Sequence, residues 1–303
     1  MATAKHRRNR KMYRLFYLMM LPGLLYFAVF RYLPMFGLVI AFKDYDIFKG
    51  IWASEWVGLK NFRELFHSSD FWNVLTNTLK ISFAKIVIGF PIPIILAILL
   101  NEMRSVRFKK VIQTLLYLPH FLSWVVIGGI MLNLFSPVFG LAGEFFRATG
   151  IEPMNILAQK STIFGVVIAS DVWKECGWST IIFLAALTQV DASLYEAAKM
   201  DGANRFKQMI YITLPAISGV IILLLILRIG KIMNAGFEQI LVLQNAVTRE
   251  SIDIFDTYVY QEGLQRGEYS FSSTVDMFKS VVAFIMVVGA DKISKKFGEE
   301  GLF

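Results

Sequence analysis

The chain has 303 residues, of which 56% are hydrophobic and only 18% are charged, with a formal net charge of +8. Soluble domains are usually about 45–50% apolar and about 25% charged. Together with a mean hydropathy of +0.55, this composition excludes an ordinary soluble domain and predicts an all-α protein that crosses a membrane several times. The single cysteine, Cys176, excludes an internal disulfide and a cysteine-based zinc site.

Six stretches are long and apolar enough to cross a bilayer, which takes roughly 20 residues of helix. The first follows a basic start, but its apolar run is too long for a cleaved signal peptide, so we expect it to be retained. The predicted spans are residues 15–42, 72–100, 111–135, 163–187, 212–233 and 271–290, within a transmembrane domain at 15–290 flanked by end segments 1–14 and 291–303. Kinks are expected at the prolines inside the spans: Pro22, Pro34, Pro91 and Pro93.

The distribution of Lys and Arg predicts the orientation of these spans. Residues 1–12, 101–110, 188–211 and 291–303 together hold 15 Lys and Arg, whereas the longer segments on the opposite side hold 8. Because positive charge collects on the cytoplasmic side, both termini are predicted to be cytoplasmic. The positive net charge is thus explained by topology, and nucleic acid is not an expected partner.

One of the segments on the opposite side, 43–71, is predicted to carry a helix. In the stretch "VGLKNFRELFHSSDFW", Leu59, Phe62 and Leu65 are near helical spacing, and Asn61 with Glu64 suggests an N-terminal cap. We expect this helix to lie at the outer surface of the membrane.

A polar stretch between the fourth and fifth spans, "LYEAAKMDGANRFKQMIYITLP", predicts a helical hairpin at 193–211 on the cytoplasmic face. Ser193 and Glu196 have the spacing of a capping box, and Asp201-Gly202 is a helix stop because glycine tolerates a left-handed backbone. Pro215 suits the first turn of the next helix. From these residues alone, an ordinary inner loop with interfacial helices remains an alternative.

The same stretch is similar to the EAA motif of permease subunits of ATP-binding-cassette (ABC) importers. Glu196-Ala197-Ala198, Gly202 and Ile212-Thr213-Leu214-Pro215 stand at the motif's spacing. The strings "WVGLKNFRELF", "LYLPHFLSWVV" and "WKECGWSTIIFLAALTQVDASLYEAAKMDGA" resemble the carbohydrate branch of the family. Within it, "LPHFLSWVVIGGIMLNLFSP" resembles the subgroup that imports complex or acidic oligosaccharides, of alginate and rhamnogalacturonan type.

The resemblance implies a type I importer permease fold and a bacterial inner-membrane location. It also implies several partners: a second related permease subunit, two ATPase subunits that bind ATP and Mg²⁺, and an extracytoplasmic solute-binding protein. The hairpin then becomes the helix that docks on an ATPase. The residues implied in this coupling are Glu196, Ala197, Ala198, Asp201, Gly202, Leu214 and Pro215.

The chain itself carries no nucleotide-binding loop, since Gly230-Lys231 is followed by Ile232 and has Leu225 where a glycine is needed. The three histidines are scattered, and neither a catalytic cluster nor a metal site is visible. We therefore expect a permease without enzymatic activity, cofactor or metal of its own.

Charged residues inside the predicted spans need a reason, because each costs roughly 2.5–3.5 kcal/mol near the bilayer centre. Two pairs at i,i+3 spacing, Asp171 with Lys174 and Asp276 with Lys279, could neutralise each other. The cations nevertheless outnumber the acids. The cations are Arg31, Lys80, Lys85, Lys174, Arg228, Lys231 and Lys279, and the acids are Asp171, Glu175 and Asp276.

A cavity with an excess of cations would attract carboxylates, which favours uronate-containing oligosaccharides as the cargo. Aromatic and amide side chains could hold a neutral sugar instead, so a neutral oligosaccharide remains an alternative, and ion-coupled secondary transport is a further one. The candidate pathway residues are Lys80, Trp124, Asn133, Asp171, Trp173, Lys174, Glu175, Trp178, Arg228 and Lys279. Of these, Asp171, Lys174, Glu175 and Trp178 share one face of a helix.

Overall fold

The computed structural model describes residues 2–296, and the burial of side chains within 13–295. The expected end segments 1–14 and 291–303 therefore lie partly outside the described residues. The chain divides into two compact units: Met1–His67 with Glu262–Met277, and Ser68–Gln261 with Phe278–Phe303. Helices supply nearly all of the regular structure in the described chain.

The first unit begins with one long helical stretch whose backbone changes type twice. Helix α1 (Ala2–Phe27) continues as the π-helix η1 (Ala28–Tyr32) and the 3₁₀-helix η2 (Leu33–Phe42). Pro22 lies inside α1 and Pro34 lies at the start of η2. A proline cannot donate the usual backbone hydrogen bond, which accounts for the change of helix type near Pro34.

A compact loop follows, made of β1 (Lys43–Asp44), α2 (Gly50–Ala53), β2 (Glu55–Trp56) and α3 (Lys60–His67), with β1 and β2 antiparallel. The predicted helix is therefore present as α3, but the predicted Asn61 cap is wrong. Asn61 is buried within α3, and its Nδ2 donates to the carbonyls of Ala41 and Lys43 at 2.9 and 3.0 Å. The amide is used to tie α3 to the preceding chain, since buried backbone carbonyls need a partner. The unit also holds most of η6 (Tyr260–Gln265) and the first residues of α17 (Tyr269–Lys296).

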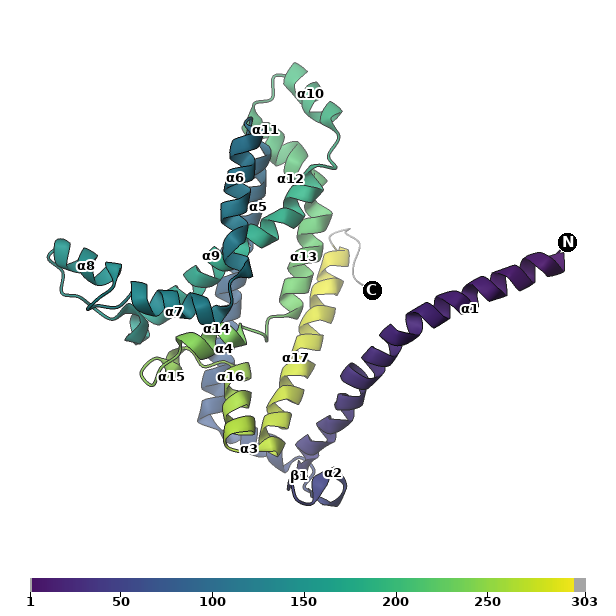
Figure 1. Ribbon diagram of the computed structural model, residues 1–303, viewed down its shortest axis with the longest axis vertical. Helices are drawn as coiled ribbons and strands as arrows, with labels where there is room; N and C mark the ends of the chain where they lie inside the picture. The colour runs from purple at the N-terminus through teal and green to yellow at the C-terminus, as the bar shows by residue number, and fades with distance from the viewer. Residues whose placement is uncertain (1, 297–303) are drawn as a thin grey trace. The chain divides into compact units, whose positions relative to one another are not determined.

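The second unit contains the remaining helices (Figure 1). In chain order they are α4 (Ser69–Gly89), α5 (Pro91–Asn101), α6 (Val106–Tyr117), η3 (Leu118–Phe121), α7 (Trp124–Leu134), α8 (Leu141–Ala148), η4 (Ile156–Ala158), α9 (Lys160–Leu187), α10 (Ala192–Met200), α11 (Arg205–Gln208), η5 (Met209–Thr213), α12 (Leu214–Ala216), α13 (Ser218–Gly230), α14 (Phe237–Leu243), α15 (Arg249–Ile252) and α16 (Phe255–Val259), followed by the rest of α17.

Helix α9 is the centre of this unit. It packs along α4 and α5 and is crossed by α6. The crossing with α6 is unusually close: a Cβ atom added to Gly177 would overlap the carbonyl group of Leu116. A glycine at this position therefore lets two helix backbones touch, as small residues commonly do in membrane helix packing.

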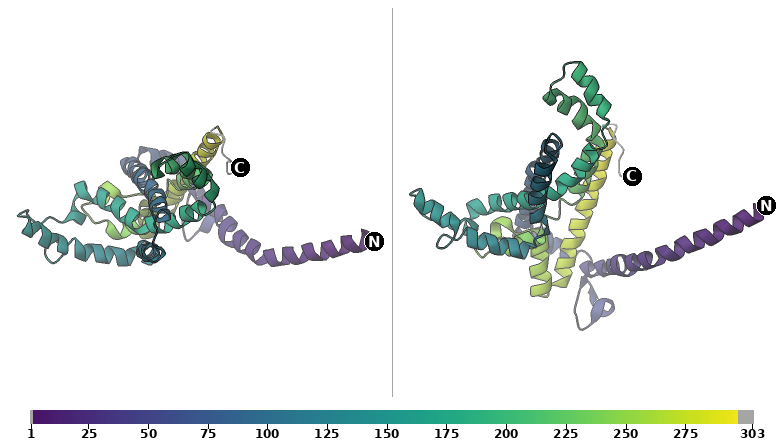
Figure 2. Two further views of the ribbon diagram at one scale, coloured as in Figure 1. Left: turned by 90° about the horizontal axis from the view of Figure 1, so that it is seen from above. Right: turned by 45° about the horizontal axis from the view of Figure 1, so that its top comes forward.

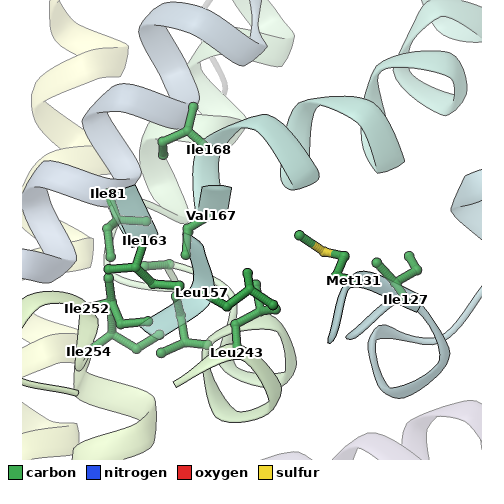
Figure 3. Packing of buried hydrophobic residues seen from close by; sticks show 12 residues of the cluster. Ile81, Ile127, Met131, Leu157, Ile163, Val167, Ile168, Leu243, Ile252 and Ile254 are labelled. Atoms are coloured by element: carbon green, nitrogen blue, oxygen red, sulfur yellow. The ribbon is translucent and has the colours of Figure 1, made fainter. Parts of the chain in front are cut away.

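The apolar core of the unit lies on both sides of α9. One cluster joins Ile81 of α4, Ile163 and Val167 of α9, and Ile252 and Ile254 from the segment around α15. Figure 3 shows several of these side chains gathered between the helices. A second cluster, Ala97, Ile98, Phe183, Leu187 and Ile217, joins α5, the other end of α9 and the start of α13.

Three helical segments of the described chain are long and apolar enough to cross a membrane: Tyr13–Phe42, Ser69–Glu102 and Tyr269–Lys295. Three further pairs of consecutive helices are long and apolar enough when the two helices of a pair are taken together, but each pair is bent at a break. These are Val106–Phe121 with Trp124–Leu134, bent by 101°, Lys160–Leu187 with Ala192–Met200, bent by 73°, and Arg205–Ala216 with Ser218–Gly230, bent by 61°. Counting each bent pair as one crossing gives six, the number predicted from the sequence. Pro91 stands where α4 gives way to α5, as expected of a proline.

Replacing Gly177 with Ala is expected to lower the stability of the protein, because the new Cβ would press on the α6 backbone; overpacking of this kind costs about 1–3 kcal/mol. Thermal unfolding in detergent measures the effect. Gly165→Ala on the same helix is the matched control, since nothing lies within 4 Å of a Cβ there. Equal unfolding temperatures for the two variants would contradict the close α6–α9 contact.

Candidate functional site

The helical hairpin predicted at 193–211 is present as α10 and α11, and it projects beyond the other helices of its unit (Figure 1 and the right-hand view of Figure 2). Its turn has the hydrogen bonds of a Schellman motif. The N–H of Gly202 donates to the carbonyl of Lys199 at 3.1 Å, and the N–H of Ala203 donates to that of Ala198 at 2.8 Å. Gly202 has a φ of +77°, the left-handed conformation that favours glycine.

The start of α10 differs from the prediction. The N-cap is Asp191, whose carboxylate accepts a hydrogen bond from the backbone N–H of Ser193 at 2.9 Å. The predicted capping box of Ser193 with Glu196 is wrong, because Ser193 already lies inside the helix. An aspartate is as good a cap as a serine, and both stand in the sequence near the helix start. Hydrogen bonds from Ser193 hold the pKa of the Asp191 carboxyl below its usual value.

The second arm of the hairpin is a longer helix than expected. Asn204 caps α11, and the helix continues through the π-helical η5 into α12, where Pro215 is in the first turn. The Tyr195 hydroxyl of α10 is 3.0 Å from the Thr213 hydroxyl of η5, and Gln208 Nε2 donates to the Ala203 carbonyl at 2.9 Å. The first contact links the two arms, and the second holds the turn to the second arm.

The hairpin presents a mixed surface of apolar and charged side chains. Glu196, Ala197, Asp201 and Gly202 are exposed, and Ala198 is half-buried. Among the apolar residues, Leu194, Met200 and Phe206 are exposed by 49%, 89% and 64%. Leu214 packs against the second core cluster, so it belongs to the hairpin's attachment rather than to its free surface. Exposed apolar side chains rimmed by charge are typical of a docking surface.

Inside the second unit, a cavity of about 530 Å³ lies between α4, α5, α9 and α13. Its lining brings together charges from three helices and the loop that follows α13. Among the described residues that line it, three are cationic and two are acidic: Lys85, Arg228 and Lys231 against Asp171 and Glu175. Three uncharged polar residues, Asn234, Ser82 and Ser179, also line the cavity.

Lys85 and Asp171 form the buried ion pair at the wall of this cavity. Lys85 Nζ is 2.7 Å from Asp171 Oδ1, and the two side chains are 9% and 13% exposed. Lys85 also donates to the Ala235 carbonyl at 2.9 Å and to Gln239 Oε1 at 2.6 Å. The ammonium therefore has three acceptors, which satisfies all of its donors. Arg228 approaches the other oxygen of Asp171 at 3.8 Å.

Lys174 and Glu175, one turn further along α9, meet the chain between η3 and α7. Lys174 Nζ donates to the carbonyls of His120 and Leu122 at 2.6 and 2.9 Å. Glu175 Oε2 is 2.9 Å from Nδ1 of His120, and the His120 ring stacks on Trp178 with 4.6 Å between centroids. The predicted polar face of this helix thus turns toward other parts of the chain.

The partners of these charges differ from the sequence prediction. The expected pair of Asp171 with Lys174 is wrong: Asp171 pairs with Lys85 and Arg228, whereas Lys174 pairs with Glu175 at 3.7 Å. Lys279 forms an ion pair with Asp256 of α16. For Asp171 and Lys279, the partners come from neighbouring helices, which spacing along a single helix cannot predict.

The remaining candidate pathway residues lie apart from the cavity. Lys80 lines a separate cleft of about 490 Å³ together with Lys160 and Glu250. Lys160 pairs with Glu250, which holds the pKa of that carboxyl below its usual value. Trp173 and Asn133 are exposed, and Asn133 Nδ2 donates to Gly129 of its own helix. Trp124 packs on the core, 5.7 Å below the Lys174 ammonium.

Sequence reasoning missed three polar residues of this region. Lys231 was counted among the cations of the spans but not among the candidate pathway residues, yet it lines the cavity. His120 was noted only as one of three scattered histidines, yet it contacts Glu175 and Trp178. Gln239, fully buried, donates to Ser170 and the Val167 carbonyl while accepting from Lys85. In the "LPHF" stretch, His120 follows a proline, which is a signal of a break in the helix. Nothing in the sequence singled out Gln239.

A family model described as "Binding-protein-dependent transport system inner membrane component" matches residues 89–291. The polygalacturonan/rhamnogalacturonan transport system permease protein YteP of Bacillus subtilis is 49% identical over 99% of this chain and 95% of its own length. Protein LplB of the same organism is 48% identical over 95% of this chain and 90% of its own length.

Solved structures agree with this match. A chain of a bacterial ABC transporter involved in the import of the acidic polysaccharide alginate is 36% identical, with a TM-score of 0.89, over 96% of this chain and 99% of the other. A chain of a bacterial alginate ABC transporter in complex with an alginate pentasaccharide-bound periplasmic protein gives a TM-score of 0.90 at 36% identity, over 97% of this chain and 99% of the other.

The family match and the likeness to solved ABC transporters identify this helical membrane chain as a transport permease of the ABC importer class. The chain belongs to the family of binding-protein-dependent transport system inner membrane components. The predicted fold class and family are thereby confirmed, and its relatives are transport permeases rather than enzymes.

Replacing Lys85 with Met is expected to destabilise the protein by about 3–5 kcal/mol, because Asp171 would lose its closest partner in a buried site. Thermal or denaturant unfolding in detergent provides the measurement. Adding Asp171→Asn to Lys85→Met should restore part of the loss, since the unpaired charge is then removed. Strictly additive effects of the two substitutions would show that the pair does not interact.

Proposed function

We propose that this chain forms half of the translocation pathway of an importer for acidic, uronate-containing oligosaccharides. The observation that carries the proposal is the 49% identity, over nearly the whole chain, to a permease named for polygalacturonan and rhamnogalacturonan. The alginate transporter among its structural relatives supports the same class of cargo. Polygalacturonan and alginate are both polymers of uronic acids, so a carboxylate is the group that they share.

The cavity offers cations placed to meet such carboxylates. Lys85 is saturated by its own partners, which leaves Arg228 and Lys231 as the cations that face the cavity. Arg228 is still 28% exposed, and its contact with Asp171 is long at 3.8 Å. A guanidinium can hold a carboxylate through two parallel hydrogen bonds, and Lys231 supplies a mobile point charge.

The partners follow from the same assignment. A second related permease subunit would supply the other half of the pathway, and an extracytoplasmic solute-binding protein would deliver the sugar. Two ATPase subunits would bind ATP and Mg²⁺ and drive the alternation between inward- and outward-facing states. The bilayer surrounds the complex, with the hairpin and both termini of this chain on the cytoplasmic side, as the distribution of Lys and Arg favours.

The hairpin is proposed to dock on an ATPase subunit. Its rigid Schellman turn, its internal hydrogen bonds and its exposed apolar side chains support this role. Glu196 would make the charged contact, while Gly202 sets the turn. Because α10 follows α9 after only a short connection, displacement of the hairpin would be passed into the membrane-spanning helices.

A neutral oligosaccharide is the second candidate cargo. It is favoured by the pairing of Lys85, Lys174 and Lys279 with acids, which leaves a smaller excess of positive charge than the sequence suggested. Ion-coupled secondary transport, an alternative from the sequence, is not retained because the chain belongs to a binding-protein-dependent family.

For the coupling role, Glu196→Ala and Gly202→Val are expected to weaken binding of the ATPase subunit by about tenfold or more, since one removes a charged contact and the other distorts the turn. Co-purification and binding-protein-stimulated ATP hydrolysis in proteoliposomes measure the loss. Gly202→Asn is the milder control, because Asn tolerates a left-handed backbone. Native assembly and hydrolysis in both of the first two variants would refute the docking role.

For the cargo, Arg228→Gln and Lys231→Gln are expected to raise the half-saturating concentration of acidic oligosaccharide by about tenfold to a hundredfold, the range for a lost charge-assisted hydrogen bond. Uptake into proteoliposomes should be compared for oligogalacturonates and for the same oligomers after reduction of their carboxyl groups. Lys110→Gln, an exposed cation of α6, is the control. Equal losses for both sugars would favour the neutral-cargo alternative.

A further inference from the structure

The third crossing of the chain is broken, and the break exposes backbone groups that need partners. Val106–Phe121 and Trp124–Leu134 meet at an angle of 101°. The last carbonyls of a helix have no partner within it, and inside a bilayer no water compensates for that loss. The carbonyls of His120 and Leu122 lie at this break.

Lys174 of α9 supplies the missing donor. Its ammonium donates to the carbonyls of His120 and Leu122 at 2.6 and 2.9 Å, and its side chain is 7% exposed. A cation at the carboxyl end of a helix also interacts favourably with the helix dipole. Glu175 holds the His120 ring from the other side, at 2.9 Å from Nδ1. One turn of α9 thus caps the broken helix from outside.

The two sides of the break are attached to different parts of the unit. On one side, α6 touches the α9 backbone at Leu116 and Gly177, so these helices are closely joined there. On the other side, α7 packs on α14, where a Cβ on Gly128 would overlap the Val242 side chain. Between these contacts, residues 120–122 are tied to α9 by three neighbouring side chains. Lys174 donates to the carbonyls of His120 and Leu122, Glu175 contacts the His120 ring, and Trp178 packs on the rings of His120 and Phe121. Lys174 is the one of the three that bonds to the backbone of the break.

We propose that Lys174 is a positioning residue that holds the α6–α7 break and passes movement of α9 on to α7. The proposal rests on the proposed docking role of the hairpin, because α9 runs without interruption from Lys160 to Leu187 and leads into α10. A displacement that enters at the hairpin reaches Lys174 along a continuous helix. Lys174 therefore binds groups of the chain itself, and the cations that remain available to bind the cargo are those of the main cavity.

The test compares Lys174→Met, which keeps the length of the side chain but removes its donors, with Lys174→Arg, which keeps the charge and can serve both carbonyls. Lys80→Met is the matched control, since Lys80 is a cation of a predicted span outside this cluster. In the reconstituted complex, Lys174→Met should retain ATP hydrolysis, while sugar taken up per ATP falls about threefold to thirtyfold, the usual range for residues that carry coupling. Lys174→Arg should restore most of the loss.

A second measurement reads the break directly. With Cys176 replaced by Ser, spin labels at Leu115 of α6 and Ile130 of α7, both exposed, report the distance across it by pulsed electron paramagnetic resonance. Lys174→Met should broaden this distance distribution, and Lys174→Arg should narrow it again. This measurement decides the question even if the Met variant assembles poorly with its partners.

An unchanged distance distribution in Lys174→Met, or native uptake per ATP in that variant, would overturn the proposal. Failure of the hairpin variants to affect assembly would instead refute the docking role, which is a separate outcome. If Lys174→Met and Lys80→Met lose uptake per ATP equally, the effect is one of general charge loss and the positioning role is wrong.

Discussion

The structure of this protein depends on one constraint: a polar group placed in hydrocarbon must find its partner inside the chain. Helix α9 shows how this is met. Its successive turns carry Asp171, Lys174 and Glu175. Each of these side chains contacts a polar group of another helix or of the break between α6 and α7. This polar face would be unfavourable if α9 were surrounded by lipid alone. Its contacts hold α4, the third crossing and the loop after α13 around α9.

The same constraint separates charges that build the protein from charges left for a cargo. The Lys85 ammonium has an acceptor from the chain for each of its three donors, and the Lys174 ammonium donates to two backbone carbonyls and lies 3.7 Å from Glu175. Arg228 and Lys231 keep open sides toward the cavity. Counting cations along the spans cannot make this distinction, because every one of them has the same formal charge in the sequence.

Much of the fold could be predicted from the sequence. Hydropathy marked the helical segments, and the spacing around Gly202 gave the hairpin and its turn, because both depend on nearby residues. The errors share a cause. Ser193, Asn61 and the pair of Asp171 with Lys174 were judged by local spacing, whereas the structure uses Asp191 as the cap, ties Asn61 to Ala41, and pairs Asp171 with Lys85. Contacts between distant segments depend on how helices pack, and no local pattern encodes Gln239 as the bridge between Lys85 and α9.

Within its own unit, the first crossing, Tyr13–Phe42, is packed only at its end: residues 13–36 are exposed, whereas Ala41 is fully buried. The apolar side chains of residues 13–36 therefore gain almost nothing from packing inside that unit, and their favourable environment has to come from outside it. An exposed helix of this length is sensitive to the thickness of the amphiphile layer around it, because any mismatch in length has to be met by tilting or bending of the helix itself.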